Sequence, residues 1–285
     1  MIVHAKPQPR NPARVVVLGA RGFIGKALME RLRAHDCPAL AVSSSEVDLA
    51  SSAAADGLGA ILRPSDAVVM LSALTPDRGR DVATLMKNLA MMESVCAVLA
   101  KTGCAQLVYF SSDAVYSFAA GRVTEETPAT PPDLYGAMHY TRELMARGLA
   151  SVPVVVLRPT LVYGAGDTHN AYGPNRFRRA AQKEGKIQLF GGGEETRDHI
   201  HVDDVAELTV RCLCHGSTGT LNVATGRSTS FHDVAQLVAR QFPNRIEIVS
   251  TPRANPITHR HYDVTNLIKA FPGYRFIPLE EGVAR

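Results

Sequence analysis

Apolar runs alternate with amphipathic segments along the first half of the 285-residue chain. Runs rich in Val, Ile and Leu are typical of strands that are buried on both faces of a sheet. Such runs lie at 14–18, 39–42, 66–74, 105–112 and 152–159. Segments with apolar residues at helical spacing separate them, from Ile24 onward, near 50–60, at 81–101 and from Tyr135 onward. The alternation predicts an α/β fold built on a doubly wound parallel sheet.

The pattern changes after Tyr163, where turn-forming residues become frequent. The later elements are expected to be short: a hairpin-like piece at 187–202, a helix at 231–242 and a strand at 246–250. We expect a smaller, irregular lobe over the carboxyl edge of the sheet, which is where such folds bind ligands.

These patterns predict two domains and a short leading segment. The sheet domain is expected to comprise 13–165 and about 198–226, and the C-terminal lobe to comprise 166–197 and 227–285. Residues 1–12 carry basic residues and prolines without an apolar stretch, so they are expected to be a disordered lead-in and no secretory signal.

Composition narrows the functional classes. With 46% hydrophobic and 20% charged residues and a net charge of +4, the chain resembles an ordinary globular protein. No apolar run approaches the length that spans a bilayer, so we expect no membrane partner. The net charge is mild and does not demand nucleic acid as a partner, so we expect none. The five cysteines lack zinc-like spacing, which favours free thiols in the cytoplasm.

Three glycines follow the first apolar run directly. Gly19, Gly22 and Gly25 stand at even spacing between a Val-rich strand and an amphipathic helix. Such a loop gives a tight turn, close backbone approach to a pyrophosphate, and a helix N-terminus aimed at it. The sequence therefore predicts a Rossmann domain that binds a dinucleotide.

The end of the second strand bears on the choice of cofactor. A carboxylate there would bind the adenosine ribose and mark NAD. The strand ends in three serines beginning at Ser43, which leave room for a 2′-phosphate that Arg21 could neutralise. NADP is therefore slightly favoured over NAD, although Glu46 would weaken this argument if it lay close by.

The chain resembles an extended short-chain dehydrogenase/reductase of the NAD-dependent epimerase/dehydratase family, the type that modifies sugar nucleotides. The resemblance covers about residues 14–283. The matching motifs are GARGFIG (19–25), Asp48-Leu49, Asn88, YFSSDAVYS (109–117), LYG (134–136), LRPTLVYG (157–164), RDHIHVDDVA (197–206) and LNVATG (221–226).

The resemblance implies three catalytic positions. Ser112 would hydrogen-bond the reacting oxygen, and Tyr135 would be the general acid/base. A Lys one turn later would hold the nicotinamide ribose and lower the tyrosine pKa, but this chain has His139 there. Histidine titrates near pH 6.5, so its positive charge would help only in part. We expect Tyr135 to work best in reduction, where it need only donate a proton.

The resemblance also implies binding residues. The cofactor would contact Gly19, Arg21, Gly22, Phe23, Ile24, Gly25, Ser43, Asp48, Leu49, Tyr135 and His139. The nucleotide-sugar would contact Asp113, Asn175, Arg197 and Arg260. His199 and His201 fall on one strand face with two aspartates beyond, but an aspartate cap on the following helix explains this better than a metal.

The function expected from these residues is hydride transfer on a nucleotide-linked sugar, with reduction of a 4-keto sugar favoured. A sugar-nucleotide 4-epimerase with tightly bound NAD and a non-catalytic NAD(P)-binding sensor are the alternatives. The Glu that would follow Asp113 in a 4,6-dehydratase is Ala114 here, which weakens that reading. The apolar face of the helix at 81–101, with Met91 and Met92, makes a homodimer plausible.

Overall fold

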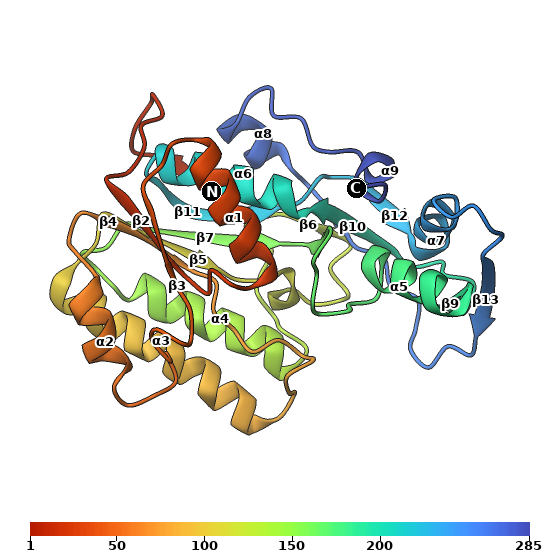
Figure 1. The fold of residues 1–285 in the computed structure, drawn as a ribbon, viewed down its shortest axis with the longest axis horizontal. Coiled ribbons are helices and arrows are strands. Elements are labelled where there is room, and N and C mark those ends of the chain that lie inside the picture. Colours follow the sequence, from red (N-terminus) through yellow and green to blue (C-terminus); the bar gives the residue numbers. More distant parts are fainter.

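A seven-stranded sheet forms the centre of the computed structural model, which describes all 285 residues (Figure 1). The strand order is β1-β11-β7-β5-β4-β2-β3. The bounds are β1 (Val3–His4), β2 (Arg14–Leu18), β3 (Ala39–Val42), β4 (Asp66–Met70), β5 (Gln106–Phe110), β7 (Val154–Pro159) and β11 (Ser217–Val223). All neighbours are parallel except β1, which pairs antiparallel with β11. The predicted fold class is confirmed.

The strand order reverses at β2. The chain passes from β2 to β3 on one side and then returns to β4 on the other side of β2. In open α/β sheets this reversal opens a crevice at the carboxyl ends of the strands, where ligands bind. The glycine loop leaves the sheet at this point.

Helices cover both faces of the sheet (Figure 1). One face carries α1 (Phe23–Ala34), α6 (Val202–Cys214) and α8 (Thr265–Ala270), and the other carries α2 (Ala54–Ile61), α3 (Val82–Thr102) and α4 (Leu134–Arg147). Alternate residues of each strand point to opposite layers. In β2, Val15 and Val17 enter the first core, and Val16 and Leu18 enter the second.

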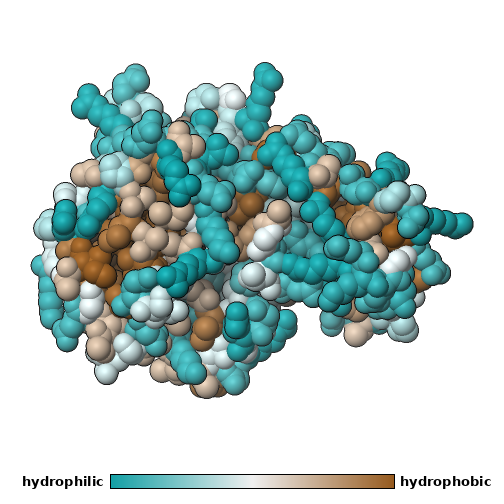
Figure 2. Space-filling model, in the orientation of Figure 1, coloured by the Kyte–Doolittle hydropathy of each residue, from teal (hydrophilic) through white to brown (hydrophobic).

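The smaller lobe lies to the right in Figure 1 and has its own buried cluster. Its helices are α5 (Pro174–Glu184), α7 (Phe231–Ala239) and α9 (Leu279–Gly282). Its strands are β8 (Leu161–Tyr163), β9 (Lys186–Phe190), β10 (Thr196–His201), β12 (Ser228–Ser230) and β13 (Glu247–Thr251). A further pair, β6 (Arg122–Val123) with β14 (His261–Tyr262), joins the two parts of the chain. Figure 2 shows mostly hydrophilic side chains over this lobe and the largest hydrophobic area over the opposite end.

Two local predictions are wrong. Residues 1–12 are not disordered, because β1 pairs with β11 and the amides of Lys6 and Arg10 bond to backbone carbonyls that follow α6 or end it. The piece at 187–202 is not a hairpin, because β9 pairs in parallel with β13 while β10 pairs with β8 and β12. In both cases the partner strand lies far away in the sequence.

The domain limits stay a prediction, but α8 bears on them. Its Leu267, with Phe271 just beyond, belongs to the same buried cluster as Val15 of β2. The end of the chain therefore contributes to the core of the sheet domain as well as to the lobe.

The expectation that no apolar run approaches the length that spans a bilayer is wrong for α3. By length and composition alone it could cross a membrane. One face of it, with Met92, Val95 and Leu99, packs into the core beneath the sheet. One such helix is weak evidence for a membrane span, and the absence of a membrane partner remains an expectation.

Candidate active site

The glycine loop has the form of a phosphate cradle. Gly19 has a φ of +94°, which favours glycine, and a Cβ there would lie 2.9 Å from the Ser72 hydroxyl. A Cβ on Gly25 would lie 2.3 Å from the Gly19 carbonyl oxygen, so only glycine lets α1 approach the turn. Gly22 is the N-cap of α1 and offers no side chain to the free amides of the first turn. These residues fit a dinucleotide pyrophosphate at the positive end of the helix.

The neighbouring predicted residues differ in what they can offer. Phe23 is buried, so its side chain belongs to the fold and only its backbone amide can face a phosphate. Ile24 is partly exposed at the start of α1. Asp48 is exposed and accepts a hydrogen bond from the Ala50 amide, while Leu49 is buried in the core beneath β3.

The room expected beside Ser43 contains a carboxylate. Glu46 folds back onto the end of β3, where it accepts hydrogen bonds from the Ser43 amide, at 2.8 Å, and from the Ser43 hydroxyl. Arg21 donates to the other Glu46 oxygen at 3.0 Å. The hydrogen bonds from Ser43 are the main cause that lowers the pKa of Glu46. The open site expected beside the serines, on which the argument for NADP depended, is therefore wrong. The Arg21 guanidinium, expected to neutralise a 2′-phosphate, is paired with Glu46 instead.

The first turn of α4 brings Tyr135 to the end of β5. Asp133 caps the helix by accepting from the Gly136 amide at 2.9 Å. A Cβ on Gly136 would lie 2.2 Å from the Ala114 carbonyl oxygen, so the absence of a side chain lets α4 pack closely on the turn after β5. Ser112 lies in that turn, where its hydroxyl accepts from the Ala114 amide at 3.1 Å. The two predicted catalytic side chains are thus neighbours.

Tyr135 is kept as a phenol by its surroundings. Burial raises its pKa to about 12, and the Asp113 carboxylate adds to the rise. A side-chain hydrogen bond with Ser112 and the positive charge of Arg142 act in the opposite direction. At neutral pH the group is almost entirely phenol, so the protonated form is available as a donor, whereas little phenolate is present to accept a proton.

His139 is not the partial cation that the sequence suggested. Its ring is buried, and Nδ1 lies 2.9 Å from the Tyr109 hydroxyl, while Nε2 has no partner. Burial and the nearby charge of Arg142 lower its pKa to about 3, so the ring is neutral at physiological pH. The ring packs edge-on against Tyr135, with centroids 4.7 Å apart. Its assignment to the nicotinamide ribose remains a prediction.

The structure joins three of the predicted substrate residues. Arg260 is buried and its Nη1 donates to the Asp113 carboxylate at 3.1 Å, while the Tyr262 hydroxyl donates to the same oxygen at 2.8 Å. Arg197 lies close enough to interact electrostatically with Asp113 and Arg260. Its guanidinium donates hydrogen bonds to the carbonyl and the hydroxyl of Thr258. Asp113 is therefore held by the lobe and is not a free loop side chain. Tyr262 is a member of this cluster that the sequence reasoning missed.

The remaining predicted residues lie elsewhere in the lobe. Asn175 stands at the start of α5, where its side-chain oxygen accepts from the Gly164 amide at 3.4 Å. His201 is the N-cap of α6 and accepts from the Asp203 amide at 3.2 Å, so the expected aspartate cap is wrong. His199 is buried beside Phe231. No three His, Cys, Asp or Glu side chains of the chain form a group that could hold a metal.

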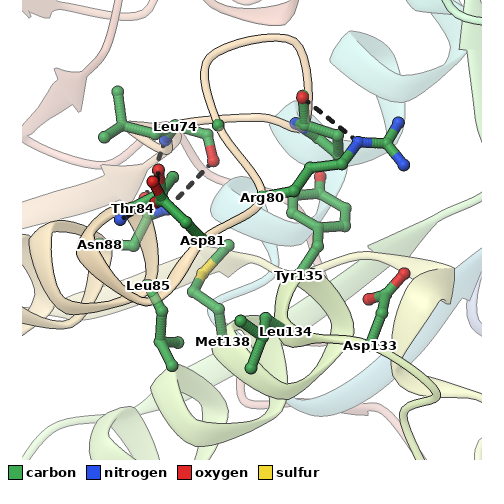
Figure 3. A pocket seen from close by; sticks show the side chains of 12 residues that line it. Leu74, Arg80, Asp81, Thr84, Leu85, Asn88, Asp133, Leu134, Tyr135 and Met138 are labelled. Carbon is green, nitrogen blue, oxygen red and sulfur yellow. Dashed lines mark hydrogen bonds between the residues drawn. The ribbon is translucent and has the colours of Figure 1, made fainter.

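A cavity of about 90 Å³ lies beside Tyr135, between α4 and the loop before α3. Figure 3 shows Tyr135 rising from α4 toward this loop, with Arg80 beside it and Asp133 at the helix start. Asn88 holds the loop by two hydrogen bonds with the backbone of Leu74, at 2.8 and 3.0 Å. The space suits a few water molecules, so it can be one corner of a binding site and not the whole of it.

Comparisons with known proteins find one matching family and several similar solved structures. The model of the NAD dependent epimerase/dehydratase family matches residues 15–224. RMD from Pseudomonas aeruginosa, complexed with NADPH, is 26% identical with a TM-score of 0.81, over 95% of this chain and 96% of that one. MoeE5 in complex with UDP-glucose and NAD is 24% identical with a TM-score of 0.80, over 95% and 96%. UDP-N-acetylglucosamine 4-epimerase from Methanobrevibacter ruminantium M1, in complex with UDP-N-acetylmuramic acid, is 21% identical with a TM-score of 0.83, over 96% and 97%.

Proposed function

Because the chain belongs to the NAD-dependent epimerase/dehydratase family, we propose that it reduces a keto group of a nucleotide-linked sugar. A dinucleotide bound at the glycine loop supplies the hydride. The observation that carries the proposal is a pair of neighbouring hydroxyls at the carboxyl edge of the sheet: Tyr135, which burial keeps as a phenol, and Ser112 in the turn after β5. In reduction the Ser112 hydroxyl orients the carbonyl oxygen, and Tyr135 donates its proton to that oxygen as the alcohol forms.

Elimination and epimerisation fit the site less well. The Asp113 carboxylate is held by Arg260 and Tyr262, and Ala114 follows it, so the acid pair for loss of water is incomplete. A 4-epimerase would first need Tyr135 to accept a proton. With a pKa of about 12, very little of Tyr135 is phenolate at neutral pH, so the form that accepts a proton is scarce. The likeness to a solved 4-epimerase keeps this reaction as the second candidate.

The lobe supports a nucleotide diphosphate as the carrier of the sugar. Arg197 and Arg260 bring two guanidinium groups near Asp113, and Arg260 Nε is buried without a partner. Only one of the two is paired with a carboxylate, so the cluster retains a positive charge. Guanidinium groups bind phosphate oxygens in bidentate fashion. We assign Arg197 to the diphosphate and Arg260 to holding Asp113 in place.

The cofactor proposal keeps NADP and NAD both open. Arg21 and Glu46 are exposed, so their ion pair is worth at most about 1 kcal/mol. Arg21 can exchange Glu46 for a 2′-phosphate at little cost, or Glu46 can accept a hydrogen bond from a ribose hydroxyl. Either cofactor therefore has a partner at the end of β3.

We also propose a homodimer through α3 and α4. Met92 is fully buried and cannot contribute, but Val82 and Met86 of α3 and Leu134 and Leu144 of α4 are exposed apolar side chains. Light scattering of the purified protein would test this. Met86→Glu should shift the mass toward the monomer, whereas Ile257→Glu, on an exposed segment of the lobe, should leave it unchanged.

The reaction is tested by adding NADPH or NADH to a panel of nucleotide-linked keto sugars and following hydride transfer by absorbance. Mass spectrometry of ligands that purify with the protein adds the cofactor state: retained NAD would favour the epimerase, and exchangeable NADPH the reductase. Tyr135→Phe should lower kcat by about 10²- to 10⁴-fold without loss of cofactor binding. Turnover that survives this substitution would contradict the assigned role, and binding without any turnover would favour the sensor.

A further inference from the structure

Arg142 on α4 carries a buried positive charge that no carboxylate neutralises. Its side chain is 1% exposed. Nη2 donates to the Ser72 carbonyl at 2.9 Å, Nη1 lies 3.8 Å from the Met138 sulfur, and Nε has no partner. The groups that favour its charged form are Tyr109, Tyr135 and Cys96, none of which is ionised at neutral pH. The guanidinium carbon lies 5.4 Å from the centre of the Tyr109 ring.

Such a charge is costly to keep inside a protein. Transfer of an ion out of water without a partner costs several kcal/mol even after relaxation. Burial lowers the pKa of Arg142, but a guanidinium in a protein keeps its proton, so arginine does not escape this cost by becoming neutral. A buried, charged group with an unused donor indicates a ligand that the chain itself does not provide.

The position of Arg142 links the tyrosine to the cofactor loop. Tyr135, His139 and Arg142 follow one another at four and three residues along α4, so they share one face of the helix. The Ser72 residue that accepts from Arg142 follows β4 and lies beside the glycine loop, where a Cβ on Gly19 would come within 2.9 Å of its hydroxyl. The guanidinium thus reaches from the catalytic helix to the crevice where the strand order reverses.

We propose that Arg142 is the permanent cation of this active site, a positioning residue that favours the phenolate of Tyr135 and faces the nicotinamide end of the bound dinucleotide. The inference rests on the proposed function, because it assigns a task within the same site. The charge that the family resemblance expects one turn after the tyrosine stands two turns after it in this chain.

The state of His139 agrees with this assignment. Arg142 helps to keep the ring neutral, and its Nε2 is the second buried polar atom on this helix face without a partner. A lysine at position 139 would place two cations side by side in the interior. A neutral His139 with a charged Arg142 gives the site one positive charge in total.

Several charges act on Tyr135 besides that of Arg142. Asp113 from the turn after β5 and Asp133 from α4 both raise its pKa, and the Ser112 hydroxyl lowers it. The lobe contributes Arg260 and Tyr262, which hold Asp113, and Arg80 lines the cavity from the loop before α3. Arg142 is the one buried cation that acts directly on the phenol, so its removal should raise the tyrosine pKa.

The experiment measures the dissociation constants of the oxidised and reduced cofactor, which needs no sugar substrate. A nearby cation disfavours the positively charged oxidised nicotinamide relative to the reduced form. Arg142→Met should therefore lower the ratio of the oxidised to the reduced dissociation constant by about tenfold. Arg142→Lys should keep the ratio, and Arg147→Met should not change it, because Arg147 lies on the same helix with its guanidinium on Glu143.

A rescue variant separates charge from packing. In the double variant His139→Lys with Arg142→Met, one cation returns one turn closer to Tyr135, and the ratio should recover toward that of the parent protein. Where a sugar substrate is found, Arg142→Met should also move the basic limb of the rate profile up by about one pH unit.

An unchanged ratio in folded Arg142→Met would overturn the inference, and so would failure of the double variant to restore it. If Arg142→Met does not fold, Arg142→Gln replaces it, since its amide can still donate to the Ser72 carbonyl. Loss of the fold in both neutral variants would mark the charge as structural and also overturn the inference. Absence of turnover on every sugar would instead defeat the proposed function and leave the binding ratios to decide about Arg142.

Discussion

Two neighbouring charged residues of α4 are both buried, but only one of them has partners of opposite charge. Glu143 is fully buried and accepts hydrogen bonds from Ser111, from Arg147 and, at 2.8 and 2.6 Å, from two nitrogens of Arg158. Arg142, the residue before it, has one hydrogen bond to a backbone carbonyl, a weak contact with a sulfur, and no anion. The difference separates two uses of charge: the satisfied network ties α4 to β5 and β7, and the unsatisfied cation remains available to a ligand.

The largest effect on stability is expected from breaking the hydrogen-bonded network around Glu143. Arg158→Met would leave Glu143 charged in the interior with only the half-exposed Arg147 beside it, and the Tyr116 hydroxyl would lose a donor at 2.8 Å. We expect a loss of about 3–5 kcal/mol in the free energy of unfolding, measured by urea denaturation. The double variant Glu143→Leu with Arg158→Met should recover much of this loss. Equal losses in the two variants would show that packing, and not the stranded charge, sets the cost.

The next largest effect on stability is expected at acidic pH, where the buried His139 beside Arg142 disfavours the folded state. The folded pKa of His139 is about 3, below its value near 6.5 in the unfolded chain, so the unfolded state binds the proton first. The stability that this group contributes is complete above pH 6.5 and is lost as the pH falls toward 3. Between pH 6.5 and 5 the loss should be about 2 kcal/mol, and His139→Gln should remove it from the pH profile of unfolding. His199, with a pKa lowered to about 4 by burial, should still give a slope in that variant. A variant slope equal to that of the parent would contradict the neutral buried state of His139.

A smaller effect on stability is expected at Arg142 itself. Replacing the buried cation by an apolar side chain of similar length removes the cost of keeping an unpaired charge out of water, which offsets the lost hydrogen bond to Ser72. Arg142→Met should therefore change the free energy of unfolding by no more than about 1 kcal/mol, in contrast to Arg158→Met. Thermal unfolding of the two variants side by side would check this. A loss at position 142 as large as that at 158 would remove the distinction between the two sides of α4.

The sheet and the closeness of Ser112 to Tyr135 could be predicted because their signals are local. The buried strands show as continuous Val-rich runs, and Gly19, Gly22 and Gly25 stand between such a run and a helix. The family resemblance assigns Ser112 after β5 and Tyr135 on α4 from their motif positions, and the structure brings the two together. These features depend on neighbours in the sequence, so reading the chain in order finds them.

The missed features depend on distant partners. The side chain of Arg142 is surrounded by Ser72 after β4 and Tyr109 of β5, neither of which is an anion. No local sequence pattern reveals these neighbours. The fold of 1–12 depends on β11, more than 200 residues away. A signal for Arg142 did exist, because its spacing places it on the helix face of Tyr135 and His139. The false hairpin at 187–202 arose from a Gly-rich link whose flanking strands pair elsewhere.

The smallest effect is expected where a charge pair lies in water. Arg21 and Glu46 form an ion pair that is exposed on both sides, unlike either charge of α4. Glu46→Gln should leave the unfolding free energy within about 0.5 kcal/mol of the parent value, because exposed pairs contribute little. It should nevertheless improve NADPH binding relative to NADH by a few-fold, since Arg21 is released and the carboxylate that repels a 2′-phosphate is gone. Fluorescence titration with both reduced cofactors measures the ratio, and Asp56→Asn on α2 serves as a control that removes a remote acidic charge. If Glu46→Gln and the control shifted the ratio equally, the change would reflect net charge alone, and the Arg21–Glu46 pair would have no part in cofactor choice.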